Sequence, residues 1–553
     1  MKISMRDLWY KRAIIYSVDI ETFYDSNGDG IGDIEGLIQR LDYLESLGVT
    51  CLWLLPFFPS PNRDNRYDVS DYYSVDPLLG SLGDFTELVH QAHDRGMRII
   101  IDLVVNHTSH DHPWFQAART NPNSRYHDFY IWSEEEPDTD EENVFPDKEE
   151  GIWSYDDEAK KWYLHRFYHH QPDLNVASEA VREEIKKIMG FWLQLGVSGF
   201  RVDAAPFLIE LEGIADAEVD VDEPYEYLRD MRDFLTLRRG DAVLLAEANV
   251  SPNEIGEYFG DDDKLHMLFN FLMNQHVFLA FAREEAEPLM RGWELPPPLP
   301  PRGQWANFLR NHDELDLDRL SEREKADVFA AFGPQKKMQI YERGIRRRLP
   351  PMFEGDERRL RMAYSLMLTL PGTPVIWKGE EIGMGDDLSL EERYSVRTPM
   401  QWSPKKNGGF SSAPKKDLIR PVIDKGDFAY ESVNVEDQRR DPKSFLNWMS
   451  RAIDRRKECP EFGFGECETI DTGHPTVFAH RCEWEGGVVM AVHNLAGRGC
   501  TVTLDLGEDR EVELIDILGD RKHEAVDEEA HKVKLGPYGC RWFRVNEAPG
   551  SRV

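Results

Sequence analysis

Three carboxylate side chains stand where short apolar runs of the sequence end, and carboxylates placed in this way could cleave a glycosidic bond. Asp203 closes the run GFRVD, in which Arg201 precedes it by two residues, while Glu247 ends LLAE and Asp313 follows FLRNH. An arginine beside a carboxylate keeps it ionised, as a nucleophile requires. An Arg-x-Asp pair alone is equally often a structural ion pair, so the inference depends on all three positions meeting in space.

Histidine and tyrosine side chains accompany these carboxylates. His107 ends the apolar run RIIIDLVVNH, His312 directly precedes Asp313, and the polar loop after the second apolar run contains Tyr67 and Asp68. A Ser-His-Asp triad is not supported, because no serine stands on a sharp turn between a strand and a helix. A catalytic metal is disfavoured, since neither histidine has a partner at ligand spacing. Carboxylates surrounded by histidine, arginine and aromatic side chains remain, and such a set is typical of glycosidic cleavage.

The elements that must position these residues alternate regularly along the sequence. Eight apolar runs alternate with amphipathic segments, which predicts an α/β protein with a closed (β/α)8 barrel, the TIM barrel. The expected strands span residues 13–18, 51–61, 98–107, 199–203, 241–249, 265–271, 306–314 and 374–381. Sites in such barrels lie at the carboxyl ends of the strands. Asp203, Glu247 and Asp313 stand at these ends, so the fold is expected to bring them together.

Two segments do not follow the alternation of strands and helices that the barrel requires. Residues 108–175 are aromatic, rich in histidine and irregular, which predicts a lid subdomain, named subdomain B, inserted after the third strand. Residues 461–553 contain short alternating strands, which predict a C-terminal antiparallel β-domain, a β-sandwich. The barrel is then expected to comprise residues 1–107 and 176–460.

The loop DSNGDGIGD, after the first strand, has oxygen-bearing side chains at every second position and glycines that permit tight winding. This arrangement suits a hard cation, so we predict a structural calcium ion and no organic cofactor. The alternative is an Asn/Asp/Gly turn without an ion. The expected ligand positions are Asp25, Asn27, Asp29, Ile31 and Asp33.

Composition excludes several classes of partner. The chain has 553 residues, with 66 Lys+Arg against 102 Asp+Glu and a net charge of −36. Such a surface repels nucleic acid and anionic membranes and suits a small neutral substrate, although a saline habitat also explains it. No apolar run approaches the ~20 residues of a membrane span, and the N-terminus lacks the apolar core of a secretory signal. The six cysteines form no CxxC pair, which predicts reduced, buried thiols in a cytoplasmic protein. Composition leaves open whether the protein is an oligomer.

Five motifs, in their order along the chain, resemble the α-amylase family of glycoside hydrolases. The resemblance covers nearly the whole chain, and the second motif, QPDLN, is typical of the branch that acts on short oligosaccharides. The motifs are DLVVNH (102–107), QPDLN (171–175), GFRVDAAPF (199–207), LLAEAN (244–249) and FLRNHDE (308–314).

The resemblance implies a role for each carboxylate. Asp203 would be the nucleophile, Glu247 the general acid and base, and Asp313 the transition-state stabiliser, with Arg201 orienting Asp203. Glu247 must start protonated, so its surroundings should raise its pKa. The anomeric configuration would be retained, with the carboxyl groups of Asp203 and Glu247 ~5–5.5 Å apart.

The resemblance also implies a set of sugar-binding residues. Asp68 is expected to pair with Arg397 and to hold the non-reducing end of the sugar, while Tyr67 stacks under the ring. The full expected set is Tyr67, Asp68, His107, Gln171, Arg201, His312 and Arg397.

The acceptor of the glucosyl group decides the reaction. Water would give an α-glucosidase, another sugar a transferase, and the released glucose itself an isomerase. Several stretches are similar to trehalose synthases, the maltose α-glucosyltransferases of this family, which implies conversion of maltose to trehalose with some hydrolysis. They are 112–119, 162–175, 257–261, 304–315 and 344–351. A catalytically silent transport subunit is a further alternative, although all three carboxylates are present.

The segments 17–23, 65–68 and 377–381 depart from the usual pattern of trehalose synthases, and two of the departures introduce a cation. Arg66 stands where a glycine is usual, and Lys378 where a tyrosine is usual. We expect both to place cations near the rim of the pocket.

Overall fold

The computed structural model describes residues 8–138, 143–146, 148–208, 225–504, 512–519 and 532–547. Eight parallel strands form a closed barrel at its centre, as predicted, and each overlaps one of the predicted runs. The run predicted over 306–314 is mostly loop, because its strand ends at Asn307. Every strand pairs with its neighbours in chain order, and β14 closes the ring on β1. The strands are β1 (Ile15–Val18), β2 (Cys51–Leu54), β3 (Arg98–Leu103), β7 (Gly199–Val202), β8 (Val243–Ala246), β9 (Met267–Phe269), β10 (Gln304–Asn307) and β14 (Thr373–Trp377).

Amphipathic helices surround the barrel. Helix α3 begins at a capping box of Ser81 and Asp84, in which each side chain accepts from the other residue's backbone N–H. Residues 34–47 form two short helices, separated at Gln39 and Arg40. The helices are α1 (Ile34–Ile38), α2 (Leu41–Leu47), α3 (Leu82–Asp94), α4 (Pro113–Thr120), α5 (Glu179–Gln194), α6 (Glu226–Arg238), α7 (Ile255–Phe259), α8 (Phe271–Arg283), α9 (Glu287–Glu294), α10 (Glu322–Phe332), α11 (Leu349–Met352), α12 (Glu357–Thr369), α13 (Val435–Arg440), α14 (Phe445–Lys457) and α15 (Glu461–Phe464).

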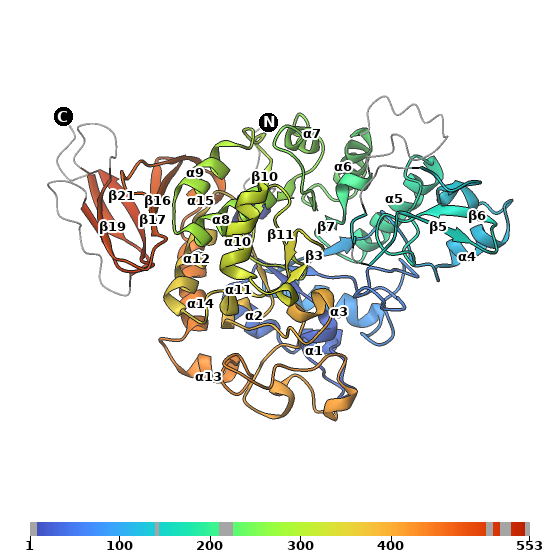
Figure 1. The fold of residues 1–553 in the computed structure, drawn as a ribbon, viewed down its shortest axis with the longest axis horizontal. Coiled ribbons are helices and arrows are strands. Elements are labelled where there is room, and N and C mark those ends of the chain that lie inside the picture. The colour runs from blue at the N-terminus through green and yellow to red at the C-terminus, as the bar shows by residue number, and fades with distance from the viewer. Residues whose placement is uncertain are drawn as a thin grey trace.

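Subdomain B lies on one side of the barrel, as the right of Figure 1 shows, between β3 and α5. It contains α4 and a small antiparallel sheet in the order β4 (Trp132–Ser133), β6 (Lys161–Leu164), β5 (Trp153–Asp156). Two isolated bridges, His107 with Asp173 and Tyr130 with Leu174, return the chain to the end of β3. The predicted insertion after the third strand is therefore confirmed, and its last residues lie beside the barrel mouth.

A smaller hairpin lies after β10, outside the barrel ring. Strands β11 (Leu315–Asp316), β12 (Gln339–Ile340) and β13 (Gly344–Ile345) form a three-stranded sheet in the order β11-β13-β12. A 3-10 helix, η7 (Glu392–Val396), follows β14. Both elements contribute side chains to the site described below.

The C-terminal antiparallel sheets lie on the opposite side of the barrel from subdomain B (Figure 1). One has the order β15 (Glu466–Thr469), β16 (Val477–Trp484), β17 (Gly487–Asn494), β21 (Cys540–Glu547), β19 (Val512–Asp516), and the other pairs β18 (Cys500–Thr503) with β20 (Lys532–Leu535). Side chains of both sheets, among them Val492, Val502 and Val533, share one buried apolar cluster. The predicted antiparallel β-domain is confirmed over residues 461–504, 512–519 and 532–547, the part of it that the structure describes.

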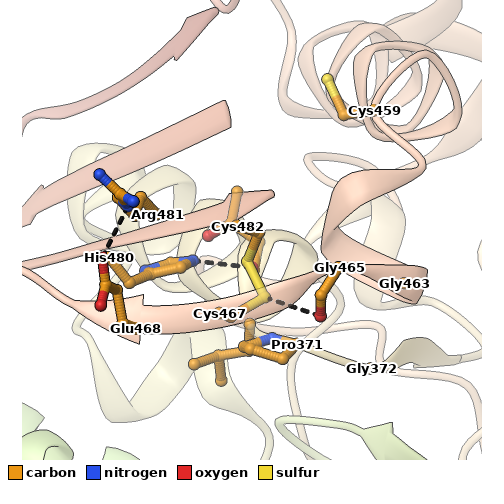
Figure 2. Close-up of a disulfide and its surroundings, with 12 residues drawn as sticks. Pro371, Gly372, Cys459, Gly463, Gly465, Cys467, Glu468, His480, Arg481 and Cys482 are labelled. Carbon is orange, nitrogen blue, oxygen red and sulfur yellow. Dashed lines mark hydrogen bonds and ion pairs between the residues drawn. A yellow bond between two sulfur atoms is a disulfide. The ribbon is translucent and has the colours of Figure 1, made fainter. Parts of the chain in front are cut away.

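The prediction of six reduced, buried thiols is wrong. Cys467 of β15 and Cys482 of β16 lie directly opposite each other, with 4.1 Å between their Cα atoms, and form a disulfide (Figure 2). The spacing of cysteines in the sequence does not reveal the strand register that brings this pair together. The free cysteines are Cys51 and Cys459, which are buried, and Cys500 and Cys540, which are partly exposed.

Candidate active site

One cavity of about 390 Å³ opens at the carboxyl ends of the barrel strands. Asp203, Glu247 and Asp313, predicted from three distant segments, all line it, together with Tyr67 and His107. Its volume lies in the range of small-molecule sites. The barrel thus brings the predicted carboxylates to one place.

The guanidinium of Arg201 joins three carboxylates. Its Nη1 donates to Asp203 Oδ1 and, at 2.6 Å, to Oδ1 of Asp102, while its Nη2 donates to Glu247 Oε2 at 2.5 Å. Strands β3, β7 and β8 are neighbours, and their register places Asp102 beside Arg201. The predicted orientation of Asp203 by Arg201 agrees with this contact, and the same arginine also fixes Glu247.

Glu247 has the electrostatic environment of a general acid. Burial raises its pKa to about 8, and the negative charges of Asp203 and Asp313 add to this effect, against the opposing attraction of Arg201. Its side chain keeps 26% exposure, on the cavity wall. Glu247 therefore holds its proton at neutral pH and can donate it to a bound substrate.

This raised pKa predicts how activity depends on pH. Because the acid is active only while protonated, kcat/KM for maltose should fall as pH rises through about 8. The test is a kcat/KM profile from pH 5 to pH 10 in buffers of constant ionic strength. A basic limb centred near pH 6, or a flat profile up to pH 10, would contradict this assignment of the acid.

Asp313 is held in its ionised form by three cationic or donor groups. Its Oδ2 lies 2.8 Å from His312 Nε2, and its Oδ1 accepts from Arg393 Nη1 at 2.8 Å and from Arg397 Nη2 at 2.6 Å. Although burial alone would raise the pKa of Asp313, these groups hold it well below its usual range. A carboxylate that stays negative can stabilise positive charge developing on a sugar ring.

Tyr67 and His312 form a pair behind Asp313. Their rings are parallel, with centroids 5.6 Å apart, and the Tyr67 hydroxyl lies 2.8 Å from His312 Nε2. Tyr67 and His107 line the cavity, as predicted sugar-binding residues should, and His107 Nε2 lies 3.2 Å from the Tyr67 carbonyl oxygen. His312 is not on the cavity wall, so it supports Asp313 and Tyr67 from behind.

The predicted pair of Asp68 and Arg397 is wrong. Asp68 is fully buried, and its oxygens accept from the Ser60 hydroxyl at 2.7 Å and from the backbone N–H of Arg63 at 3.2 Å. Arg397 instead donates to Asp313 and lies 4.0 Å from Oδ1 of Asp64. Asp64 therefore occupies the place that the sequence suggested for Asp68.

Asp64 and Arg393 are the site residues that sequence reasoning missed. Both line the cavity, and Arg393 Nη2 donates to Asp64 Oδ1 at 2.9 Å. Gln171, a predicted wall residue, lies one layer behind and donates to Asp64 Oδ2 at 3.1 Å. The turn between Asp64 and Tyr67 has positive φ at Asn65 and Arg66, 46° and 69°. This turn, which a string of polar residues does not reveal, decides which aspartate faces the cavity.

Arg66 and Lys378, the two cations expected at the rim of the pocket, lie elsewhere in the structure. Arg66 is buried and donates to Glu21 at 3.1 Å and to Asp76. Lys378 is buried too, and its Nζ donates to the Thr398 carbonyl oxygen at 2.7 Å. Neither side chain lines the cavity, so the prediction for both is wrong.

The loop predicted to bind calcium uses its side chains as acceptors for its own backbone. Asp25 accepts from the N–H groups of Gly28 at 2.6 Å and Gly30 at 2.8 Å, and Asp33 accepts from Gly36 at 2.6 Å, where it caps α1. Asn27 and Asp29 each accept from the residue two positions ahead, in Asx turns. Among the described residues, no group of three or more His, Cys, Asp or Glu is placed to hold a metal. This geometry favours the turn alternative, because both Asp25 oxygens already accept two hydrogen bonds each.

The helices give no indication of a membrane span. Across the ranges that the structure describes, none combines the length and apolar character needed to cross a bilayer.

Comparison with known proteins identifies the family. The model of the alpha amylase catalytic domain matches residues 17–328 and 345–463. The chain belongs to the alpha-amylase family. A second model, that of the sucrose hydrolase-like C-terminal domain, matches residues 486–544, within the C-terminal sheets.

Within the alpha-amylase family, the chain is similar to trehalose synthases. It is 43% identical over 548 residues to the trehalose synthase of Thermus thermophilus, covering 98% of this chain and 56% of that protein. The chain thus spans little more than half the length of this relative. It is 40% identical over 545 residues to the trehalose synthase/amylase TreS of Mycobacterium tuberculosis, covering 97% of this chain and 90% of that protein. The solved trehalulose synthase MutB of Pseudomonas mesoacidophila MX-45 has a TM-score of 0.75 and 26% identity, over 97% of this chain and 99% of that one.

Proposed function

We propose that this member of the alpha-amylase family is a retaining enzyme that converts maltose to trehalose within one binding event, with some hydrolysis to glucose. The observation that carries the proposal is the single cavity lined by Asp203, Glu247 and Asp313. The similarity to trehalose synthases over nearly the whole chain supports the choice of substrate and acceptor.

In the first step the glycosidic bond of maltose breaks. Glu247 gives its proton to the bridging oxygen while a carboxylate oxygen of Asp203 attacks the anomeric carbon of the non-reducing glucose. One glucose leaves, and the other is bonded to Asp203 as a glucosyl ester. Arg201 donates to the attacking carboxylate and orients it, and the negative Asp313 stabilises the cationic character of the ring.

In the second step the released glucose returns as the acceptor. Glu247, now ionised, takes the proton of the anomeric hydroxyl of that glucose, whose oxygen attacks the glucosyl carbon and frees Asp203. The two displacements at this carbon restore the α configuration. The product is an α,α-1,1-linked disaccharide, and Glu247 has regained its proton.

The remaining cavity residues would hold the non-reducing glucose. Tyr67 and His107 lie on the wall and offer a ring face and an imidazole to the sugar. Asp64, held by Arg393 and Gln171, also lines the cavity and would accept hydrogen bonds from hydroxyl groups of the sugar.

Water is the competing acceptor, and its use would make the protein an α-glucosidase. The name of the Mycobacterium relative includes amylase, a hydrolytic activity, which favours this second candidate. Both reactions share the first step and differ only in which hydroxyl group reaches Glu247. Exclusion of water from the cavity therefore decides between them.

The test is to incubate the purified chain with maltose and to assign the products by nuclear magnetic resonance. Trehalose as the main product is expected, with a minor amount of glucose. Glucose alone would replace the proposal with the α-glucosidase reading, and recovery of unchanged maltose would contradict any catalytic role.

Calcium at residues 25–33 stays a prediction, with Asp25, Asn27, Asp29, Ile31 and Asp33 as its proposed ligand positions. If the ion binds there, its binding to the folded state alone raises the melting temperature by mass action. Chelator-treated protein should then gain several degrees of melting temperature in millimolar calcium, and Asp29→Ala should abolish the gain. Equal melting temperatures with and without calcium would refute this site.

A further inference from the structure

Among the contacts between subdomain B and the barrel, one compact cluster lies beside the active-site cavity. The carboxylate of Glu392, in η7, accepts from the Tyr168 hydroxyl at 2.6 Å and from the Tyr341 hydroxyl at 3.3 Å, and lies 2.7 Å from Lys148 Nζ. Lys148 and Tyr168 belong to subdomain B, whereas Tyr341 belongs to the turn between β12 and β13. We call these four residues the latch, since one carboxylate joins three separate segments.

An aromatic layer lies beneath the latch. Phe145 of subdomain B packs against Tyr168 and Tyr341, with ring centroids 4.5 Å and 4.7 Å away. Phe145 also lines the cavity, so the segment that the latch secures is part of the cavity wall. Release of the latch would therefore loosen a wall of the active site.

The next residue in η7 connects the latch to the catalytic carboxylates. Arg393 bridges Asp313 and Asp64, and its guanidinium lies 5.3 Å from the ring centroid of Phe145. Glu392 thus holds subdomain B while its neighbour holds the stabilising carboxylate. Motion of subdomain B relative to η7 would disturb both contacts together.

The backbone at this point is locally constrained. Glu392 has a φ of 44°, in the left-handed region that a residue with a side chain seldom adopts. Its carbonyl oxygen accepts from Arg346 Nη1 at 2.9 Å, which secures the conformation from the side of the β13 segment. Because surrounding contacts must maintain such a conformation, its presence at the latch indicates a functional constraint.

We propose that Glu392 is a positioning residue that decides between transfer and hydrolysis, by keeping subdomain B closed over the glucosyl-enzyme. This inference rests on the proposed function, because it concerns the fate of the glucosyl group. While the latch is closed, the released glucose stays beside Glu247 and water is kept out. When the latch opens, glucose leaves and water takes its place as the acceptor.

The experiment substitutes one latch residue on the barrel side and one in subdomain B, and compares both variants with matched controls outside the latch. Glu392→Ala removes the carboxylate, and Tyr168→Phe removes only one hydroxyl group, so the second variant is expected to fold. The controls are Glu391→Ala, at the exposed neighbour of Glu392, and Tyr155→Phe, at a tyrosine of subdomain B that is 47% exposed. The double variant Glu392→Ala/Tyr168→Phe tests whether the two effects share one interaction.

The decisive measurement is the ratio of glucose to trehalose formed from maltose. We expect a rise of about tenfold in Tyr168→Phe, the effect of losing one hydrogen bond to a charged group in the closed state, and a rise at least as large in Glu392→Ala, which loses three partners. The double variant should have the same glucose-to-trehalose ratio as the single Glu392→Ala variant. Glu392→Gln, which retains an acceptor oxygen, should have a ratio between those of the wild type and Glu392→Ala. A ratio in the latch variants equal to that of the controls would overturn the proposal.

A second measurement separates this inference from the proposed function. If the wild-type chain forms no trehalose, the proposed function fails, but hydrogen exchange of backbone amides in residues 148–171 still reports on the latch. Faster exchange in Glu392→Ala and Tyr168→Phe than in both controls is the result that supports the latch. Exchange equal to that of the controls would show that Glu392 does not hold subdomain B.

Discussion

Replacing Asp203 with asparagine should reduce the turnover of maltose by at least about 10⁴-fold, since removing a nucleophile eliminates the covalent step. The amide is nearly the same size as the carboxylate and keeps a carbonyl oxygen as acceptor for Arg201, so the fold should survive. Initial rates with maltose and a far-ultraviolet circular dichroism spectrum are the two measurements. Turnover within tenfold of the wild type, in a folded variant, would remove Asp203 from the mechanism.

Asp241→Asn is the matched control for this substitution. Asp241 precedes β8 at the opposite end of the barrel and is also paired with arginines, at 2.6 Å to Arg98 and 3.1 Å to Arg239. Loss of the same charge there tests whether any broken ion pair in the barrel impairs activity. We expect this variant to retain nearly the full turnover of maltose.

Glu247→Gln should reduce maltose turnover by about 10³-fold, the usual contribution of a general acid and base. Its effect should depend on the leaving group, because fluoride leaves without a proton whereas the glucose of maltose needs one. With α-glucosyl fluoride, the rate of fluoride release in the first turnover should therefore fall far less than with maltose. The fall of kcat/KM near pH 8 should also vanish in this variant, because the titrating group is gone.

The contrast with Asp203→Asn gives this second prediction its specificity. A missing nucleophile impairs both substrates equally, whereas a missing acid impairs only the substrate that needs protonation. Equal losses of Glu247→Gln on maltose and on α-glucosyl fluoride would show that Glu247 acts through structure and not as the acid.

The barrel and its catalytic carboxylates could be predicted from the sequence because their signals are local. Each strand is a short apolar run, and the site of a (β/α)8 barrel lies at the carboxyl ends of its strands. Asp203 and Glu247 directly follow β7 and β8, whereas Asp313 lies in the loop after the end of β10 at Asn307. The position of Asp313 at the carboxyl end of the barrel could still be predicted, because the run that precedes it leads out of a barrel strand. The presence of all three carboxylates in one cavity follows from the closed order of the strands.

The residues that were missed depend on conformations that local patterns do not encode. Asp64 and Asp68 stand four positions apart in one polar loop, and two residues with positive φ decide that Asp64 faces the cavity. The disulfide of Cys467 with Cys482 depends on the register of two strands. The contact of Tyr168 with Glu392 joins residues 224 positions apart, from two irregular segments, and no pattern in either predicts it.

Trapping the glucosyl-enzyme tests the central claim most directly, namely that one carboxylate of the cavity becomes bonded to the sugar. A fluorinated α-glucosyl fluoride, which forms the ester but releases it slowly, would be added to the protein before proteolysis and mass spectrometry. The account predicts a glucosyl adduct on the peptide that contains Asp203, and none in Asp203→Asn. An adduct on a different residue, or no adduct while the reagent inhibits turnover, would contradict it.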